Sequence, residues 1–139
     1  MPVCSGDIKN FADSLCTTDE VTARAAVGRY YYAAYHAIME LFPVIPNYSN
    51  MGSHESIIHY LAEDAHRLEK LPKRTMLRLS LKLNAMKARR VAADYKIGDE
   101  FQPSMAAIMK NEVESFFSIY SEISTDIANR KTSSIKVTP

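Results

Sequence analysis

Arg29 and His36 are the two residues of this chain best suited to act together on a phosphate group. They are seven residues apart, and seven helical steps turn about 700°, so both side chains would leave one face roughly 10 Å apart along the axis. Arginine offers a planar, permanently charged fork for phosphate oxygens. Histidine gains or loses a proton near neutral pH. The pair therefore has the chemistry to cleave RNA without a metal.

In such a reaction, His36 would deprotonate the ribose 2′-OH or protonate the leaving oxygen, while Arg29 would hold the scissile phosphate. One histidine cannot easily serve as acid and base at once, whereas two copies in a symmetric dimer could. Tyr32 shares the face and could support the site. On spacing alone, a solvated arginine beside a packed histidine is the commoner explanation of such a pair.

The elements that must position this pair are predicted to be helices, because strand patterns are nearly absent and proline and glycine fall in clusters. The expected helices span residues 7–15, 17–42, 53–70, 73–97 and 105–130. Thr17–Glu20 is expected to form a capping box, Ser53 a cap and Gly98 a C-terminal stop. The predicted fold class is all-α, an up-and-down bundle of four to five helices, with one domain over residues 1–130 and a polar, flexible tail over 131–139.

Composition agrees with one globular domain: the chain has 139 residues, of which 47% are apolar and 24% charged. No apolar run approaches the ~20 residues of a membrane span, and residues 1–7 do not resemble a secretory signal. A cytoplasmic location with free thiols at Cys4 and Cys16 is therefore expected. His54, His59 and His66 lack metal-ligand spacing, so neither a metal nor a cofactor is expected.

Positive charge is concentrated between Lys70 and Lys96, where nine basic residues accompany a single acid. Four of them fall on one helical face and could follow an RNA backbone: Arg74, Arg78, Lys82 and Arg89. The alternative, favoured without other information, is a solvated face that pairs with acidic neighbouring helices.

Arg90 and Asp94 continue the apolar stripe of the same helix, so both would lie in line with the core face. A charge there needs a partner, and the four-residue spacing supplies one. The favoured interpretation is a structural ion pair near the site, and the alternative is that Arg90 reaches a site shared with the helix of Arg29.

Three segments together resemble the small stand-alone proteins of the HEPN family. Residues 29–36 resemble its Arg-x-x-Tyr-x-x-aromatic-His segment, residues 53–58 its histidine-led third helix, and residues 90–95 its Arg-x-x-Ala-Asp-Tyr ending. The segments occur in the family's order, and the resemblance covers about residues 18–130.

The resemblance implies a homodimeric all-α bundle and a metal-independent endoribonuclease with Arg29 and His36 as catalytic residues. It further implies a toxin or phage-defence effector, with RNA as substrate and a nucleotidyltransferase or another antitoxin as partner. Two alternatives remain open: a non-catalytic HEPN module that binds a partner protein or a nucleotide, and a dimeric scaffold that binds nucleic acid without cutting it.

Overall fold

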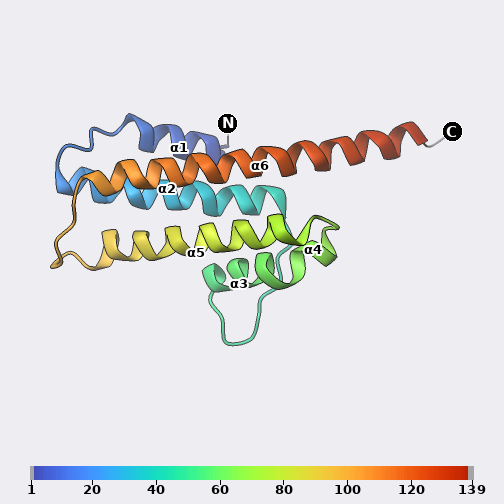
Figure 1. The fold of residues 1–139 in the computed structure, drawn as a ribbon, viewed down its shortest axis with the longest axis horizontal. Coiled ribbons are helices and arrows are strands. Elements are labelled where there is room, and N and C mark those ends of the chain that lie inside the picture. Colours follow the sequence, from blue (N-terminus) through green and yellow to red (C-terminus); the bar gives the residue numbers. More distant parts are fainter. Residues whose placement is uncertain (1, 138–139) are drawn as a thin grey trace.

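The computed structural model describes residues 2–137, and side chains as far as residue 131. Over these residues the chain is all helical, as predicted, and contains no strand. Its helices are α1 (Ser5–Ser14), α2 (Glu20–Leu41), α3 (Ser53–His59), α4 (Ala65–Leu68), α5 (Lys73–Tyr95) and α6 (Ser104–Val137), with a π-helical segment, η1 (Tyr60–Asp64), between α3 and α4. Helices α1, α2, α5 and α6 lie side by side, and α3 and α4 pack against α5 (Figure 1).

Helix α2 is the centre of the bundle and contacts α1, α5 and α6. Small residues let three neighbours approach it closely, because Ala23, Ala26, Ala33, Ala34 and Ala37 are all fully buried. The larger side chains of Val27, Tyr30, Tyr31 and Ile38 are buried, and that of Leu41 is partly buried.

The start of α2 differs from the predicted capping box. Asp19 is the N-cap, and its carboxylate accepts a 2.8 Å hydrogen bond from the backbone N–H of Thr22, so the helix begins at Glu20. An aspartate at this position also interacts favourably with the helix dipole, whereas Thr17 and Thr18 lie outside the helix. At the other end the helix stops before Pro43, as predicted.

The helix predicted over residues 53–70 is present from Ser53 to Leu68, but in its interior η1 interrupts the α-helical hydrogen bonding. The hydroxyl of Ser80 on α5 donates a 2.8 Å hydrogen bond to the Ile58 carbonyl just before η1. A side chain that takes a helical carbonyl in this way favours a local π-turn. The predicted cap is wrong, because Gly52 is the N-cap and Ser53 is the first helical residue.

The last two helices also end differently from prediction. Gly98 adopts no left-handed conformation, and α5 stops at Tyr95. Arg24 of α2 supplies the stop instead: it donates to the carbonyls of Ala93 (2.9 Å) and Asp99 (2.9 Å), and also to those of Ala92 and Lys96. Helix α6 continues to Val137 rather than ending near Arg130, and its C-terminal part extends past the other helices (Figure 1).

The core lies between α2, α5 and α6. Helix α5 contributes an apolar stripe of Met76, Leu79, Leu83 and Met86, and α6 contributes Met109, Val113, Phe116, Ile119 and Ile123, all buried. Across the described part of the chain, no helix combines the length and the apolar character needed to cross a membrane.

Candidate functional site

Arg29 and His36 are both exposed on α2, on either side of Tyr32. The Arg29 guanidinium carbon lies 5.1 Å from the centre of the Tyr32 ring, and the His36 ring centre lies 6.4 Å from it. The two functional groups are therefore within about 12 Å of each other and share one aromatic neighbour. Among the described residues, no hydrogen bond or ion pair engages the side chain of either one, and both side chains are exposed.

Arg90 of α5 also contacts Tyr32. Its guanidinium donates a 2.9 Å hydrogen bond to the Tyr32 hydroxyl and a 3.3 Å hydrogen bond to that of Tyr95. The predicted ion pair is present, because Arg90 Nε lies 3.2 Å from Asp94 Oδ2. Through its hydrogen bond to Tyr32, Arg90 also reaches α2, the helix that carries Arg29 and His36.

A glycine makes this approach of α5 to α2 possible. A Cβ atom at Gly28 would lie 3.2 Å from Asp94 Oδ1, which is closer than an ordinary contact. The missing side chain therefore lets the Asp94 carboxylate rest against α2 while it pairs with Arg90.

His54 of α3 completes an aromatic cluster that we define as Tyr31, Tyr32, Tyr35, His36 and His54. The Tyr35 ring centre lies 4.5 Å from that of His54 and 5.3 Å from that of His36, so the two imidazoles are within about 10 Å. The Tyr31 hydroxyl is hydrogen-bonded to His54 Nδ1 at 2.6 Å. Burial, together with the positive charges of Arg90 and Lys87, lowers the pKa of His54.

His36 also borders a pocket of about 360 Å³ between α2 and the start of α1. Glu40 lines the same pocket, but its carboxylate is already engaged by the backbone N–H and hydroxyl of Ser5 and by the Tyr120 hydroxyl. These contacts anchor α1 and α6 to the end of α2 and give Glu40 a structural role.

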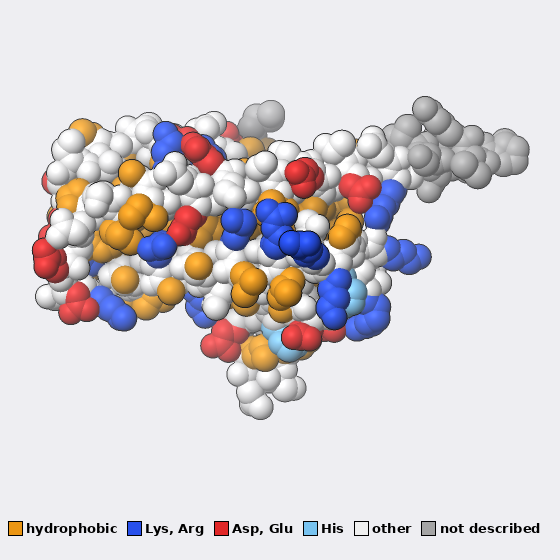
Figure 2. Space-filling model, in the orientation of Figure 1, with side chains coloured by type: hydrophobic (Ala, Val, Ile, Leu, Met, Phe, Trp, Pro, Cys, Tyr) orange, Lys and Arg blue, Asp and Glu red, His pale blue; other side chains and the backbone are white. Residues whose placement is uncertain are grey.

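The predicted RNA-binding residues of α5 divide into two groups. Arg89 is committed to α6, because its guanidinium forms a 2.7 Å ion pair with Glu112 and its Nε donates to both carboxylate oxygens. Arg74 and Arg78 are exposed, and Lys82 is partly buried beside a shallow pocket. Lysine and arginine side chains gather over the start of α5 and over α4 in the view of Figure 2.

Among the described residues, no group of three or more His, Cys, Asp or Glu side chains is placed to hold a metal ion. Cys4 and Cys16 are both free and exposed.

Compared with known proteins, the chain matches no family model, no curated protein and no solved structure.

Sequence reasoning missed three residues, two of them in this region and one at the end of α5. Tyr35 and His54 were not assigned to the site, although the dense run of tyrosines in residues 30–35 and the histidine at the start of α3 were visible. Arg24 was also missed, because an arginine between alanines on a helix gives no sign of the distant carbonyls that it binds.

Proposed function

We propose that the chain is a metal-independent endoribonuclease in which Arg29 binds the scissile phosphate and His36 transfers a proton. The observation that carries this proposal is the placement of both side chains, exposed and uncommitted, around the ring of Tyr32. The resemblance of residues 29–36 to the HEPN segment supports the same function. The exposed Arg74 and Arg78 would guide the RNA backbone.

The reaction needs only the RNA and these side chains. His36 removes the proton of the ribose 2′-OH, the 2′ oxygen attacks phosphorus, and the bond to the 5′ oxygen breaks. Arg29 stabilises the charge that develops on the phosphate oxygens. A proton returns to the leaving 5′ oxygen, so the products are a 2′,3′-cyclic phosphate and a 5′-hydroxyl.

The returning proton is best supplied by a second imidazole. In our proposal this group is His36 of a second copy in a homodimer, so that one cleft holds two Arg29/His36 sets. Such an enzyme would act as a toxin or phage-defence effector, held in check by a nucleotidyltransferase or another antitoxin partner.

The test is expression of the wild type and of the Arg29→Ala/His36→Ala variant, followed by analysis of growth and total RNA. The matched control is Arg67→Ala/His66→Ala, which removes the same two residue types from α4. We expect growth arrest and RNA fragmentation with the wild type and the control, and neither with the Arg29/His36 variant. Circular dichroism of each purified protein checks that it folds.

Purified enzyme then identifies the chemistry. Cleavage in the presence of EDTA that leaves cyclic phosphate ends agrees with the proposal. Cleavage that stops on chelation, or that continues in the double variant, contradicts it.

A second candidate function is a non-catalytic module that binds a partner protein. The observation in its favour is that α2 also exposes two large apolar side chains, Val21 (79% exposed) and Met39 (43%). For this function, the Arg29→Ala/His36→Ala variant would behave like the wild type in both assays, and substitution of Val21 and Met39 would release the partner.

A further inference from the structure

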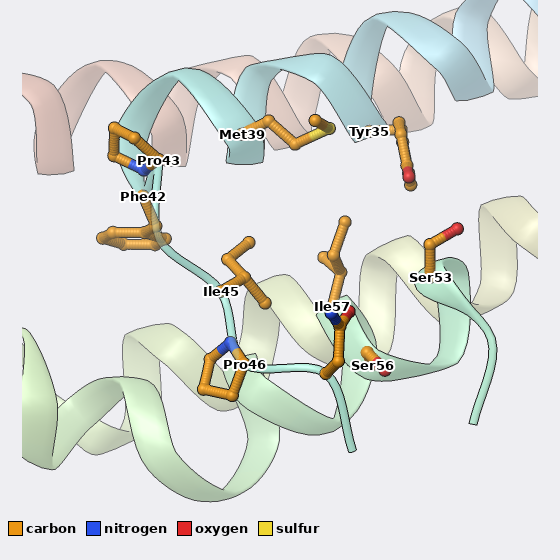
Figure 3. A pocket seen from close by; sticks show the side chains of 10 residues that line it. Tyr35, Met39, Phe42, Pro43, Ile45, Pro46, Ser53, Ser56 and Ile57 are labelled. Carbon is orange, nitrogen blue, oxygen red and sulfur yellow. The ribbon is translucent and has the colours of Figure 1, made fainter. Parts of the chain in front are cut away.

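A second pocket, lined by Tyr35, lies between α2, the 42–52 loop and α3 (Figure 3). Its volume is about 170 Å³. Tyr35 and Met39 point into it from α2, and Ile45 and Ile57 face them across the opening. Uncharged polar groups complete the lining at Asn47, Ser53 and Ser56.

The lining determines what kind of ligand fits. None of the lining residues is charged, so the pocket offers no partner for a phosphate or a metal ion. An aromatic ring, aliphatic walls and a few hydroxyl and amide groups suit a small, neutral, flat molecule with hydrogen-bonding edges. Unstacked nucleobases have this character and are commonly bound by stacking on aromatic side chains and by hydrogen bonds at their edges.

The loop that forms one wall is fixed in place by Tyr48. The Tyr48 hydroxyl donates to the Asp64 carboxylate, its ring centre lies 4.4 Å from that of His59, and its backbone N–H lies 3.4 Å from Ser56 Oγ. Burial, and then the hydrogen bond to Asp64, raises the pKa of Tyr48 to about 12, so this donor is retained at neutral pH. The wall is thus held in position before a ligand arrives, which reduces the entropy lost on binding.

Tyr35 connects this pocket to the proposed site of cleavage. One side chain lines the pocket and also packs perpendicular to His36 with ring centres 5.3 Å apart. A base stacked on Tyr35 would therefore be next to the imidazole proposed to act on the adjoining ribose.

We propose that this pocket binds one unpaired nucleobase of the RNA substrate and so determines which nucleotide adjoins the cut. The inference rests on the proposed endoribonuclease function for its substrate class. Tyr35 provides the stacking surface, and the Asn47 side-chain amide and the Ser53 hydroxyl provide hydrogen bonds to the base edge. Serine and asparagine donate and accept, so they can distinguish bases by their edges.

The first experiment measures binding without cleavage. The full chain is titrated with each of the four ribonucleoside 3′-monophosphates and, separately, with inorganic phosphate, and amide resonances are followed by NMR. We expect at least one nucleotide to give saturable shifts at residues 45–57 and at the Asn47 side chain, whereas inorganic phosphate gives none there. Absence of such shifts with all four nucleotides, or equal shifts with phosphate, overturns the proposal.

Two variants test the assignment within the pocket. Ser53→Phe places a bulky ring at the opening and is expected to abolish these shifts. Asn47→Ala removes one hydrogen-bonding group on an exposed loop and is expected to weaken binding about threefold to tenfold. Asn111→Ala, an exposed asparagine on α6, is the matched control and should bind like the wild type. Unchanged binding in both pocket variants contradicts the assignment.

Nucleotide binding and RNA cleavage, measured on the same proteins, distinguish the base site from the proposed nuclease function. A chain that binds a nucleotide in the pocket but does not cut RNA would overturn the nuclease function and retain the base site. A chain that cuts RNA with the same base preference in the wild type and in Ser53→Phe would retain the nuclease and overturn the base site.

Discussion

The guanidinium of Arg90 donates a 2.9 Å hydrogen bond to the hydroxyl of Tyr32, so α5 holds the aromatic ring that stands between Arg29 and His36 on α2. The same guanidinium is paired with Asp94, and its Nε is buried. The candidate catalytic face of α2 is therefore positioned by a charged group from another helix.

Removal of the Tyr32 hydroxyl should measure how much its hydrogen bond with Arg90 contributes to stability. Tyr32→Phe keeps the ring but leaves Arg90 without one acceptor, so we expect the free energy of unfolding to fall by about 1 kcal/mol. Tyr95→Phe is the matched control: its hydrogen bond is longer, at 3.3 Å, and its side chain is 67% exposed. Urea unfolding of both variants should show the smaller loss for Tyr95→Phe, and equal losses would contradict the assigned positioning.

Arg24 is a buried charged residue and should be one of the most sensitive to substitution in the chain. Arg24→Ala removes a charged donor from several backbone carbonyls at the end of α5, and we expect a loss of about 3 kcal/mol in unfolding free energy. Arg24→Lys keeps the charge but cannot reach these acceptors together, so it should recover less than half of the loss. Arg67→Ala removes an exposed ion pair with Asp64 and should cost less than about 1 kcal/mol. A small loss for Arg24→Ala would show that water can replace the guanidinium as the donor to these carbonyls.

His54 should make stability depend on pH in mildly acidic solution. Burial first, then Arg90 and Lys87, lower its folded-state pKa below 6.5, so the unfolded chain binds this proton more readily. The contribution of neutral His54 is fully present above pH 6.5 and decreases as the pH falls toward the folded-state pKa. His54→Asn does not titrate, so its unfolding free energy should decline less than that of the wild type over this range. Parallel pH profiles of the two proteins would contradict the assignment.

Gly28 should show a conflict between helix propensity and packing. Alanine in place of glycine stabilises a helix by about 1 kcal/mol. Here the new Cβ would press on the Asp94 carboxylate and disturb its pair with Arg90, so we expect Gly28→Ala to gain less than this amount. In an Asp94→Ala background the full gain should return. A double-mutant cycle measures the difference, and strict additivity would mean that Asp94 moves aside at no cost.

The basic residues of α5 should differ in their effect on RNA affinity. With the His36→Ala variant as a binding form, Arg74→Ala and Arg78→Ala should each reduce the slope of log affinity against log salt by about 1. Arg89→Ala should change the slope less, because Glu112 already neutralises that guanidinium. Slopes equal to that of the parent protein in the first two variants would remove α5 from the RNA-binding surface.

Much of the fold could be predicted because its signals are local. Pro43 and Pro72 mark the ends of helical segments, and the spacing of Met76, Leu79 and Leu83 identifies a core face before any contact is known. The Arg90–Asp94 pair was also predictable, since both residues lie within one turn of the same helix.

The features that sequence reasoning missed depend on residues far apart in the chain. Arg24 binds carbonyls 68 to 75 residues away, and these contacts, rather than Gly98, end α5. The π-helical segment likewise coincides with a hydrogen bond from Ser80, 22 residues from its acceptor. Neither partner is visible from the spacing of residues within a single helix.

The stop supplied by Arg24 has a consequence for the order of folding. A peptide that contained only α5 would lack this stop, so the turn with Asp94 and Tyr95 would fray in water. That turn becomes ordered only when α2 has docked, and with it the contacts of Arg90 to Tyr32. A collapsed chain whose helices have not yet docked would thus present Arg29, Tyr32 and His36 on α2 without the Arg90 contact that holds the Tyr32 ring. Hydrogen exchange at the end of α5 would report when the site is complete.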